Sequence, residues 1–423
     1  MREKRRPCAR LALALVLVLA VAIAPIGVRA AEAPQPARDH AEDFDAMWRA
    51  IDAGYAYFGA DGRTAWRDAR AAWRPRAVKA RTAREFLAAL EGALATLHDG
   101  HVSLSRRTPD SPRRIPSETD IWAHWEGSDA RIDAVRTFGD ADVAGLHPGD
   151  TVLRVQGEDV EAAVRARTGT DAAPGARDRA LRELLAGPRF GALRLDVRDE
   201  RGTRSLAIAR AAPSPANGAP IAAHRVGDER DIGYLRLKPA SADAGIVEHL
   251  DAALGDLADT RGLIIDLRES AGPASRAATR AILARFAPAG APWQLRESRN
   301  GRRVTDTVPD GARPYPGRLV VLVDRWTEGE AEALAAGLGQ AAHARLVGTA
   351  TAGLRGNLRR VTLPHSRIVL RFPAERTFLL DGTPREALRP DIAVDLAAPS
   401  GGPGDPILYQ ALKAFEPPRT PAR

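Results

Sequence analysis

The sequence predicts an α+β protein of several domains: a helical N-terminal segment, a β-rich module and an α/β core. Three patterns carry this prediction. Apolar residues recur at helical spacing between Phe44 and His98. Short alternating stretches separated by Gly/Pro turns fill the region from about Ile121 to Arg210. From about His224 to Asp395, apolar strands alternate with helices, which is typical of a parallel sheet with crossover helices.

The first 30 residues have the three parts of a secretory signal peptide. Arg2, Lys4, Arg5 and Arg6 precede an apolar run from Leu11 to Ile23, and Val28-Arg29-Ala30 supplies a small-residue cleavage site. The apolar run is short for a membrane span. We therefore expect a periplasmic or secreted protein with no stable membrane span after cleavage; an uncleaved anchor is the alternative. The only cysteine, Cys8, would leave with the signal, so no disulfide is expected.

The net charge of +8 comes from 62 basic residues, nearly all arginine, against 54 acidic residues. The arginines are scattered and often have Asp or Glu nearby, whereas a nucleic-acid-binding protein clusters its basic residues with aromatics among them. We therefore expect no nucleic-acid partner. His98 and His101 lack the carboxylate of an HExxH motif, so we expect no metal and no other cofactor.

Proline-rich linkers divide the chain at Ala31–Arg38, Arg106–Ser117 and Ala212–Pro220. The predicted domains are a signal peptide (1–30), a helical N-terminal domain (31–110), a β-rich module (115–212), an α/β core (222–396) and a C-terminal tail (397–423).

The predicted elements follow from periodicity and turn residues. In the β-rich module we expect helices at 160–166 and 178–185 and strands at 193–197 and 205–208. In the core we expect strands at 232–237, 262–267, 319–323, 344–348, 359–363, 366–372 and 391–394, with helices at 244–257, at 276–286 and from about 331. Ligands of parallel sheets bind at the carboxyl ends of the strands, which selects three loops: 266–274, 324–332 and 348–357.

The stretch Leu319–Leu338 changes abruptly from a buried strand to an alanine-rich helix. Such a turn is where α/β folds present a nucleophile, because backbone N–H groups at the start of the helix can stabilise an oxyanion. The turn itself reads Glu328-Gly329-Glu330, so it contains neither serine nor cysteine.

Several separate stretches match short motifs of one known family in the family's own order, over most of residues 44–396. They are Leu97-His-Asp-Gly-His101-Val (family LxDGH), Ala144–Asp150 with Val155-Gln-Gly157 (PDZ domain), Gly262–Arg268 (strand before the DLRxNxGG loop), Val323-Asp-Arg-Trp-Thr327 with Glu332 (nucleophile turn, DRWTxSxGE), Gly348-Thr349 with Ala352-Gly353, Phe372–Glu375, and Asp381–Glu386 through Asp391. Together they resemble the C-terminal-processing (tail-specific) serine peptidase family, in its tricorn-core-like branch.

The resemblance implies a PDZ-like module, a crotonase-like peptidase core, and peptides or protein C-termini as partners. It also implies a serine nucleophile, a histidine base, a glutamate and a further hydroxyl beside the histidine. The histidine corresponds to His101 and the glutamate to Glu386, while Gly100 stands where the accessory hydroxyl would be. The oxyanion donors correspond to the backbone N–H groups of Gly272 and Glu330.

Three departures from the family pattern fall on one site. The nucleophile position corresponds to Gly329, which has no side chain. Ser270-Ala271-Gly272-Pro273 replaces the usual Asn-Pro-Gly-Gly, and Pro273 has no N–H to donate. The lysine of the Ser/Lys branch would fall near Leu354, and no lysine is nearby.

These departures favour an exported peptide-binding or scaffold protein with weak or no proteolysis. The alternative is an active serine-type endopeptidase that uses another hydroxyl, such as Thr327 on the same turn or Ser270 on the facing loop. A third hypothesis has His101 and Glu386 activate water in the space left by Gly329. The sequence assigns no substrate identity and no oligomeric state.

Overall fold

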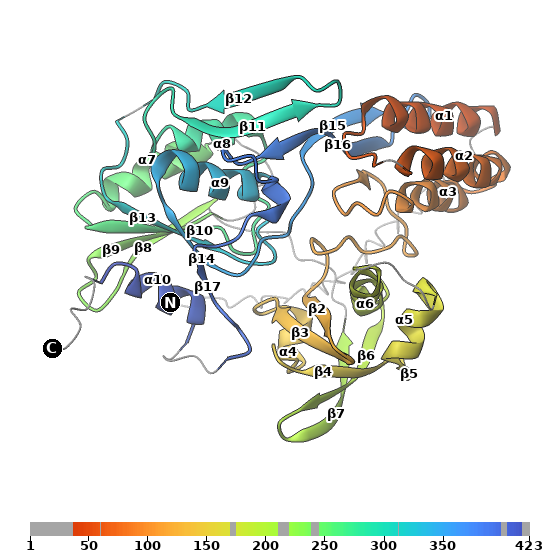
Figure 1. Ribbon diagram of the computed structural model, residues 1–423, viewed down its shortest axis with the longest axis horizontal. Coiled ribbons are helices and arrows are strands. Elements are labelled where there is room, and N and C mark those ends of the chain that lie inside the picture. Colours follow the sequence, from red (N-terminus) through yellow and green to blue (C-terminus); the bar gives the residue numbers. More distant parts are fainter. Residues whose placement is uncertain are drawn as a thin grey trace, which may run out of the picture. The chain divides into compact units, whose positions relative to one another are not determined.

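The computed structural model describes residues 37–59, 61–169, 175–209, 220–237, 245–311, 313–398 and 404–416 (Figure 1). The signal peptide predicted for residues 1–30 lies outside these ranges. None of the helices within them combines the length and the apolar character needed to cross a membrane.

Three N-terminal helices pack around a core of their own. They are α1 (Ala37–Gly54), α2 (Gly62–Lys79) and α3 (Ala83–Ala95), and α3 begins where the side chain of Thr82 accepts the backbone N–H of Glu85. Phe44, Trp66 and Leu90 are fully buried at their centre, because the apolar residues recur at the spacing of one helix face. The predicted helical N-terminal segment is therefore confirmed.

The β-rich module is an antiparallel sheet covered by two longer helices (Figure 1). Its strands run in the order β2 (Ile121–Glu126), β3 (Asp129–Val135), β4 (Thr151–Val155), β6 (Ala192–Asp199) and β7 (Gly202–Ala209), with β5 (Glu158–Asp159) paired to β4. The helices are α4 (Asp140–Val143), α5 (Val160–Thr168) and α6 (Ala176–Ala186). The predicted strands and helices of this module are confirmed. The β2–β3 hairpin was not predicted, although alternate residues of β3 are buried.

The core contains a six-stranded sheet in the order β17-β14-β13-β10-β9-β8. Its strands are β8 (Ile221–Val226), β9 (Ile232–Leu237), β10 (Gly262–Asp266), β13 (Arg318–Val323), β14 (Arg345–Gly348) and β17 (Ile392–Ala393), all parallel to their neighbours except β8. The crossover helices α7 (Ile246–Asp256), α8 (Arg276–Leu283) and α9 (Glu330–Ala342) cover one face. This confirms the predicted parallel sheet.

The other face of this sheet is covered by helix α10 (Pro406–Lys413), which lies in the predicted C-terminal tail. Alternate strand residues such as Ile264 and Leu322 pack against Ile407 and Ala411 of this helix and against Phe415 just beyond it. Strands β10 and β13 are therefore buried on both faces, which explains why they read as continuous apolar runs.

A second, antiparallel sheet joins the core to the N-terminal helices (Figure 1). It contains β1 (Ser103–Leu104), β11 (Pro292–Ser298), β12 (Arg303–Thr307), β15 (Asn357–Thr362) and β16 (Val369–Phe378). The strands predicted at 359–363 and 366–372 belong to this sheet rather than to the parallel one. The reason is the short loop at residues 363–368, which is long enough for a hairpin and too short for a crossover.

Candidate functional site

Gly329 lies at the sharp turn between β13 and α9 with φ 58° and ψ −114°, a conformation that residues with a side chain rarely adopt. A Cβ atom placed on Gly329 would lie 3.8 Å from the carbonyl oxygen of Ala271 and 3.9 Å from Nε2 of His101. There is therefore room for a small side chain, and a hydroxyl on it would be within hydrogen-bond reach of the imidazole. The structure thus brings the predicted histidine and the predicted nucleophile position together.

His101 is held between α3 and β1 by two contacts. Its Nδ1 lies 2.6 Å from the carbonyl oxygen of Arg355, and its backbone N–H donates to Oδ1 of Asp99 over 2.9 Å. The other oxygen of Asp99 accepts the hydroxyl of Tyr55 over 2.8 Å. Because a carbonyl oxygen only accepts, Nδ1 carries the proton, and Nε2 presents a lone pair toward Gly329.

Burial lowers the pKa of His101 to about 4, so the imidazole is neutral at neutral pH. The unfolded chain binds a proton at a histidine near pH 6.5, whereas the folded chain does so only near pH 4. Stability that depends on neutral His101 is therefore fully present above about pH 6.5 and is lost as the pH falls toward 4.

We expect His101→Gln to remove this dependence. Between pH 7.5 and 4.5, the unfolding free energy of the wild type should fall by roughly 2 kcal/mol more than that of the variant, measured by urea titration. Burial raises the pKa of Asp324 to about 6, which acts in the opposite direction, but this contribution is the same in both proteins and cancels. A difference between the two proteins that does not change with pH would contradict the prediction.

Glu386 is not hydrogen-bonded to His101. It lies in the short 3-10 turn Arg385–Ala387, and its Oε2 atom is buried without a hydrogen-bond partner among the described residues. The Arg355 carbonyl takes the place at Nδ1 that a carboxylate occupies in a catalytic triad. The charge of Glu386 affects Tyr57 instead. The pKa of Tyr57 is raised mainly by burial and, to a smaller extent, by the negative charge of Glu386.

Glu332 fixes the backbone of the turn from inside the protein. Its carboxylate is fully buried and accepts four hydrogen bonds, from the backbone N–H groups of Gly329, Gly353 and Leu354 and from the hydroxyl of Thr351, over 2.7–3.2 Å. Burial raises the pKa of Glu332, and Arg385 and these donors oppose the rise. The glutamate that matches the family's nucleophile turn therefore binds the loop after β14 to the start of α9.

The loop at residues 270–273 packs directly against the start of α9. The N–H of Gly272 donates to Oγ of Ser270 over 3.0 Å, and the carbonyl of Ala271 accepts the N–H of Ala331 over 3.3 Å. A Cβ atom on Gly272 would clash with the backbone of Ala331, so only glycine fits here. Of the two predicted oxyanion donors, the Gly272 N–H is therefore already bonded, and the Glu330 N–H has no acceptor within the described ranges.

The two hydroxyls considered as replacement nucleophiles, those of Thr327 and Ser270, are buried and take part in hydrogen bonds within their own loops. Thr327 and Ser270 both have 0% exposure. Thr327 Oγ1 donates to the carbonyl of Leu267 over 2.9 Å and accepts the N–H of Asp324 over 2.9 Å. The absence of a side chain at Gly100, the position of the accessory hydroxyl, also follows from the packing. A Cβ atom there would lie 2.6 Å from a backbone carbonyl oxygen and would force the loop to move.

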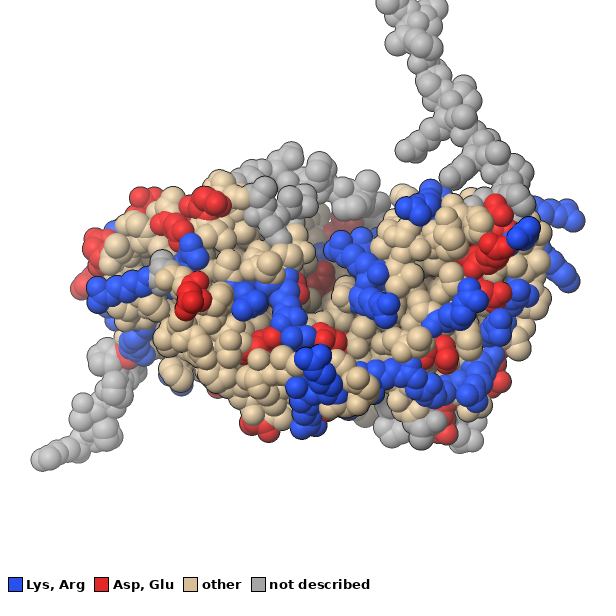
Figure 2. Space-filling model, turned by 90° about the horizontal axis from the view of Figure 1, so that it is seen from above, with Lys and Arg blue, Asp and Glu red and all other residues tan. Residues whose placement is uncertain are grey.

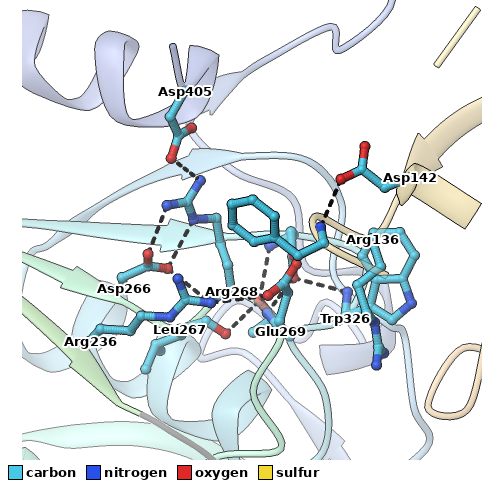
Figure 3. A network of polar contacts seen from close by, with 12 residues as sticks. Arg136, Asp142, Arg236, Asp266, Leu267, Arg268, Glu269, Trp326 and Asp405 are labelled. Carbon is cyan, nitrogen blue, oxygen red and sulfur yellow. Dashed lines mark hydrogen bonds and ion pairs between the residues drawn. The ribbon is translucent and has the colours of Figure 1, made fainter. Parts of the chain in front are cut away.

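The residues that match the DLR and DRWT motifs form a buried polar network (Figure 3). Arg268 donates two hydrogen bonds to Asp266, over 2.9 and 2.8 Å, and lies 2.6 Å from Asp405 at the start of α10. Asp324 accepts the N–H of Trp326, whose indole N–H donates to the carbonyl of Thr119 over 2.7 Å. These motif residues therefore join the strand ends to α10 and to the segment that enters the β-rich module.

A cavity of about 710 Å³ opens at the turn. All three loops selected from the sequence contribute to its wall, together with β15, β16 and the segment before β2. The lining residues are His101, Ser103, Arg114, Ser117, Ala271, Gly272, Pro273, Ala274, Ser275, Arg276, Glu328, Gly329, Glu330, Leu354, Gly356, Asn357, Leu358, Arg360, Arg371, Glu375 and Arg385. The arginines of this wall were not predicted from the sequence. Arg114, Arg276, Arg360 and Arg371 lie outside the matched motifs, and Arg385 lies in the matched stretch 381–386 but was not singled out there.

A strand-to-helix turn that faces a neutral histidine is an arrangement also found in serine peptidases, although this turn has no nucleophile. The family model of peptidase family S41 matches residues 231–394, and that of the tricorn protease C1 domain matches residues 36–95. The chain belongs to the C-terminal-processing (tail-specific) serine peptidase family, in its tricorn-core-like branch.

Solved structures share the fold. The photosystem II D1 C-terminal processing protease is 20% identical, with a TM-score of 0.52 over 84% of this chain and 93% of that chain. Mature CPAF complexed with lactacystin is 15% identical, with a TM-score of 0.53 over 90% of this chain and 97% of that chain. Another structure of mature CPAF is 14% identical, with a TM-score of 0.54 over 90% of this chain and 95% of that chain.

Proposed function

We propose that this chain is an exported, peptide-binding member of the tail-specific peptidase family with weak or no proteolysis. The observation that carries the proposal is Gly329 at the turn, because the position that faces His101 Nε2 has no atom to form an acyl-enzyme. Two further features support it: Nδ1 of His101 is bonded to a carbonyl rather than to Glu386, and the Gly272 N–H is bonded to Ser270. Export rests on residues 1–30.

The ligands in this proposal are extended peptides or protein C-termini. The β-rich module would act as a PDZ-like domain, attached to a crotonase-like core. Strand β15 lines the cavity and, within the described residues, pairs only with β16, so its other edge is open to an added strand. Residues 358–360 of β15 are exposed. A peptide that adds to this edge would lie next to the turn at Gly329.

The alternative, an active serine endopeptidase, requires another nucleophile. Thr327 and Ser270 are fully buried, and each uses its hydroxyl in a local hydrogen bond. To attack a peptide bond, either residue would have to leave the hydrogen bonds that hold its own turn. The geometry therefore favours binding without covalent chemistry.

A test uses the protein that begins at Ala31, a fluorophosphonate probe, casein, and an array of overlapping peptides. We expect no labelling and no casein cleavage, together with measurable binding to a subset of the peptides. Binding should fall at least about tenfold for peptides that carry N-methyl groups at alternate backbone nitrogens, because these cannot pair with an edge strand. Labelling that is lost in Thr327→Ala or Ser270→Ala, or casein cleavage abolished by His101→Ala, would overturn the proposal.

A further inference from the structure

The cavity at Gly329 contains two arginines that face each other across neighbouring strands. Arg360 of β15 lies directly opposite Arg371 of β16 in the antiparallel register, so both side chains project from the same face of the sheet. Both line the cavity, and neither has a carboxylate partner within the described residues. Like charges directly opposite each other destabilise a sheet, so this pair is costly unless an anion lies between them.

A third arginine of the cavity is buried and only partly satisfied. Arg385 is 2% exposed, and only its Nη2 has an acceptor, the carbonyl of Gly356 at 3.1 Å. Nε and Nη1 are buried without a hydrogen-bond partner in the described part of the chain. The nearby Glu332 does not bond to them, because its two oxygens already accept four other hydrogen bonds. A buried guanidinium with free donors is a strong site for an anionic group.

The cavity remains basic when its other charged residues are considered with Arg360, Arg371 and Arg385. Arg114 shares Glu118 with Arg107 and with Arg189, so one carboxylate serves three guanidinium groups. Burial lowers the pKa of Arg114, as do the charges of Arg371 and Arg189, while Glu328 raises it.

The five arginines of the wall outnumber its three glutamates, and each glutamate already accepts a hydrogen bond. Glu375 bonds to Arg296 and Asn357, Glu330 accepts the hydroxyl of Thr279, and Glu328 accepts the hydroxyl of Ser117. Figure 2 shows a hollow in the face that it draws, bordered by Lys and Arg side chains together with some Asp and Glu side chains.

We propose that this cavity selects acidic polypeptide segments through Arg360, Arg371 and Arg385. The proposal rests on the peptide-binding function proposed above and specifies the chemistry of the ligand. A peptide strand added to β15 places every second side chain on the face that carries Arg360, so the favoured ligand has Asp or Glu at alternate positions. A carboxylate on this face would lie next to Arg360, in the cavity that Arg371 and Arg385 also line.

The test uses fluorescein-labelled peptides of alternating Val and Glu, and the same peptides with Gln in place of Glu. Each is made with a free and with an amidated C-terminus, and binding is measured by fluorescence anisotropy. We expect the Glu peptide to bind at least about tenfold more tightly than the Gln peptide, whether or not the C-terminus is amidated. Raising the salt concentration should weaken the binding of the Glu peptide.

Arg360→Gln and Arg371→Gln should each reduce the preference for Glu over Gln to less than about threefold. Arg359→Gln is the matched control, because Arg359 is the neighbour of Arg360 on β15, projects from the other face and does not line this cavity. It should leave the preference unchanged.

Equal binding of the Glu and Gln peptides would overturn the acidic selectivity and leave the peptide-binding function standing. Loss of binding on amidation would assign the site to a C-terminal carboxylate and would also overturn it. If no peptide binds, here or in the array, the proposed function itself fails.

Discussion

Gly329→Ser is expected to fold and to gain labelling by a fluorophosphonate probe. A Cβ atom at this position meets no atom closer than 3.8 Å, so the cost is limited to the backbone strain of a side chain at φ 58°, about 1–2 kcal/mol. The new hydroxyl would lie within reach of Nε2 of His101, whose lone pair can accept its proton. Labelling is followed on a gel and stability by urea unfolding.

Gly329→Ala is the matched control, since it carries the same backbone strain without a hydroxyl. It should unfold at the same urea concentration as Gly329→Ser and remain unlabelled. Adding His101→Ala to Gly329→Ser should abolish labelling. Labelling that persists without His101 would show that the imidazole does not activate the residue at this position.

Peptide hydrolysis by Gly329→Ser should remain slow, because the oxyanion loop is a separate defect. Replacing the loop with the usual Asn-Pro-Gly-Gly, through Ser270→Asn, Ala271→Pro and Pro273→Gly, removes the side chain that now bonds the Gly272 N–H. One oxyanion donor contributes about 10²–10³ in rate, so the combined variant should be faster than Gly329→Ser by a factor of this order. Equal casein cleavage rates in the two variants would place the remaining defect elsewhere, for example at Glu386.

Glu332→Ala is expected to be the most destabilising single substitution near the site. It removes a fully buried carboxylate and leaves three backbone N–H groups and the Thr351 hydroxyl without an acceptor. The Arg385 guanidinium also loses the negative charge of Glu332, with which it interacts. Unpaired buried donors cost about 1–3 kcal/mol each, with partial relief by water, so we expect a loss of about 4 kcal/mol or more in the free energy of unfolding.

Glu330→Gln is the control for Glu332→Ala, because Glu330 lies in the same turn of α9 and accepts a single hydroxyl, that of Thr279. It should cost less than about 1 kcal/mol, because an amide oxygen can still accept that bond. Urea titration of both variants checks the comparison. A Glu332→Ala variant within 1 kcal/mol of the wild type would mean that the turn does not depend on this carboxylate.

The fold was predictable wherever a local pattern decided it. Strand β9 has the predicted bounds, and β10, β13 and α7 lie within two residues of theirs, because continuous apolar runs bounded by turns leave few alternatives. Strands β11 and β12 were not predicted. Their sequences, PWQLRES and RVTDT, are rich in polar residues, since one face of this hairpin is exposed.

The site was predictable in its position but not in its hydrogen bonding. The three loops chosen from the strand ends all line the cavity, and His101 faces Gly329 as the motif match implies. The missing bond between Glu386 and His101 could not be read from the motif, because it depends on which carbonyl reaches Nδ1. The opposed pair Arg360 and Arg371 depends on strand register, which alternating charged residues do not fix.

The sequence by itself determined that the turn between β13 and α9 has no nucleophile, because Gly329 has no side chain in any fold. It also determined that Pro273 cannot donate a hydrogen bond. Only the tertiary structure decided that Arg355, 254 residues away in the chain, holds the imidazole, and that three arginines from β15, β16 and the turn after β16 meet in one cavity. Side-chain chemistry is a local property of the chain, whereas hydrogen-bond partners and clustered charges arise from packing between distant segments.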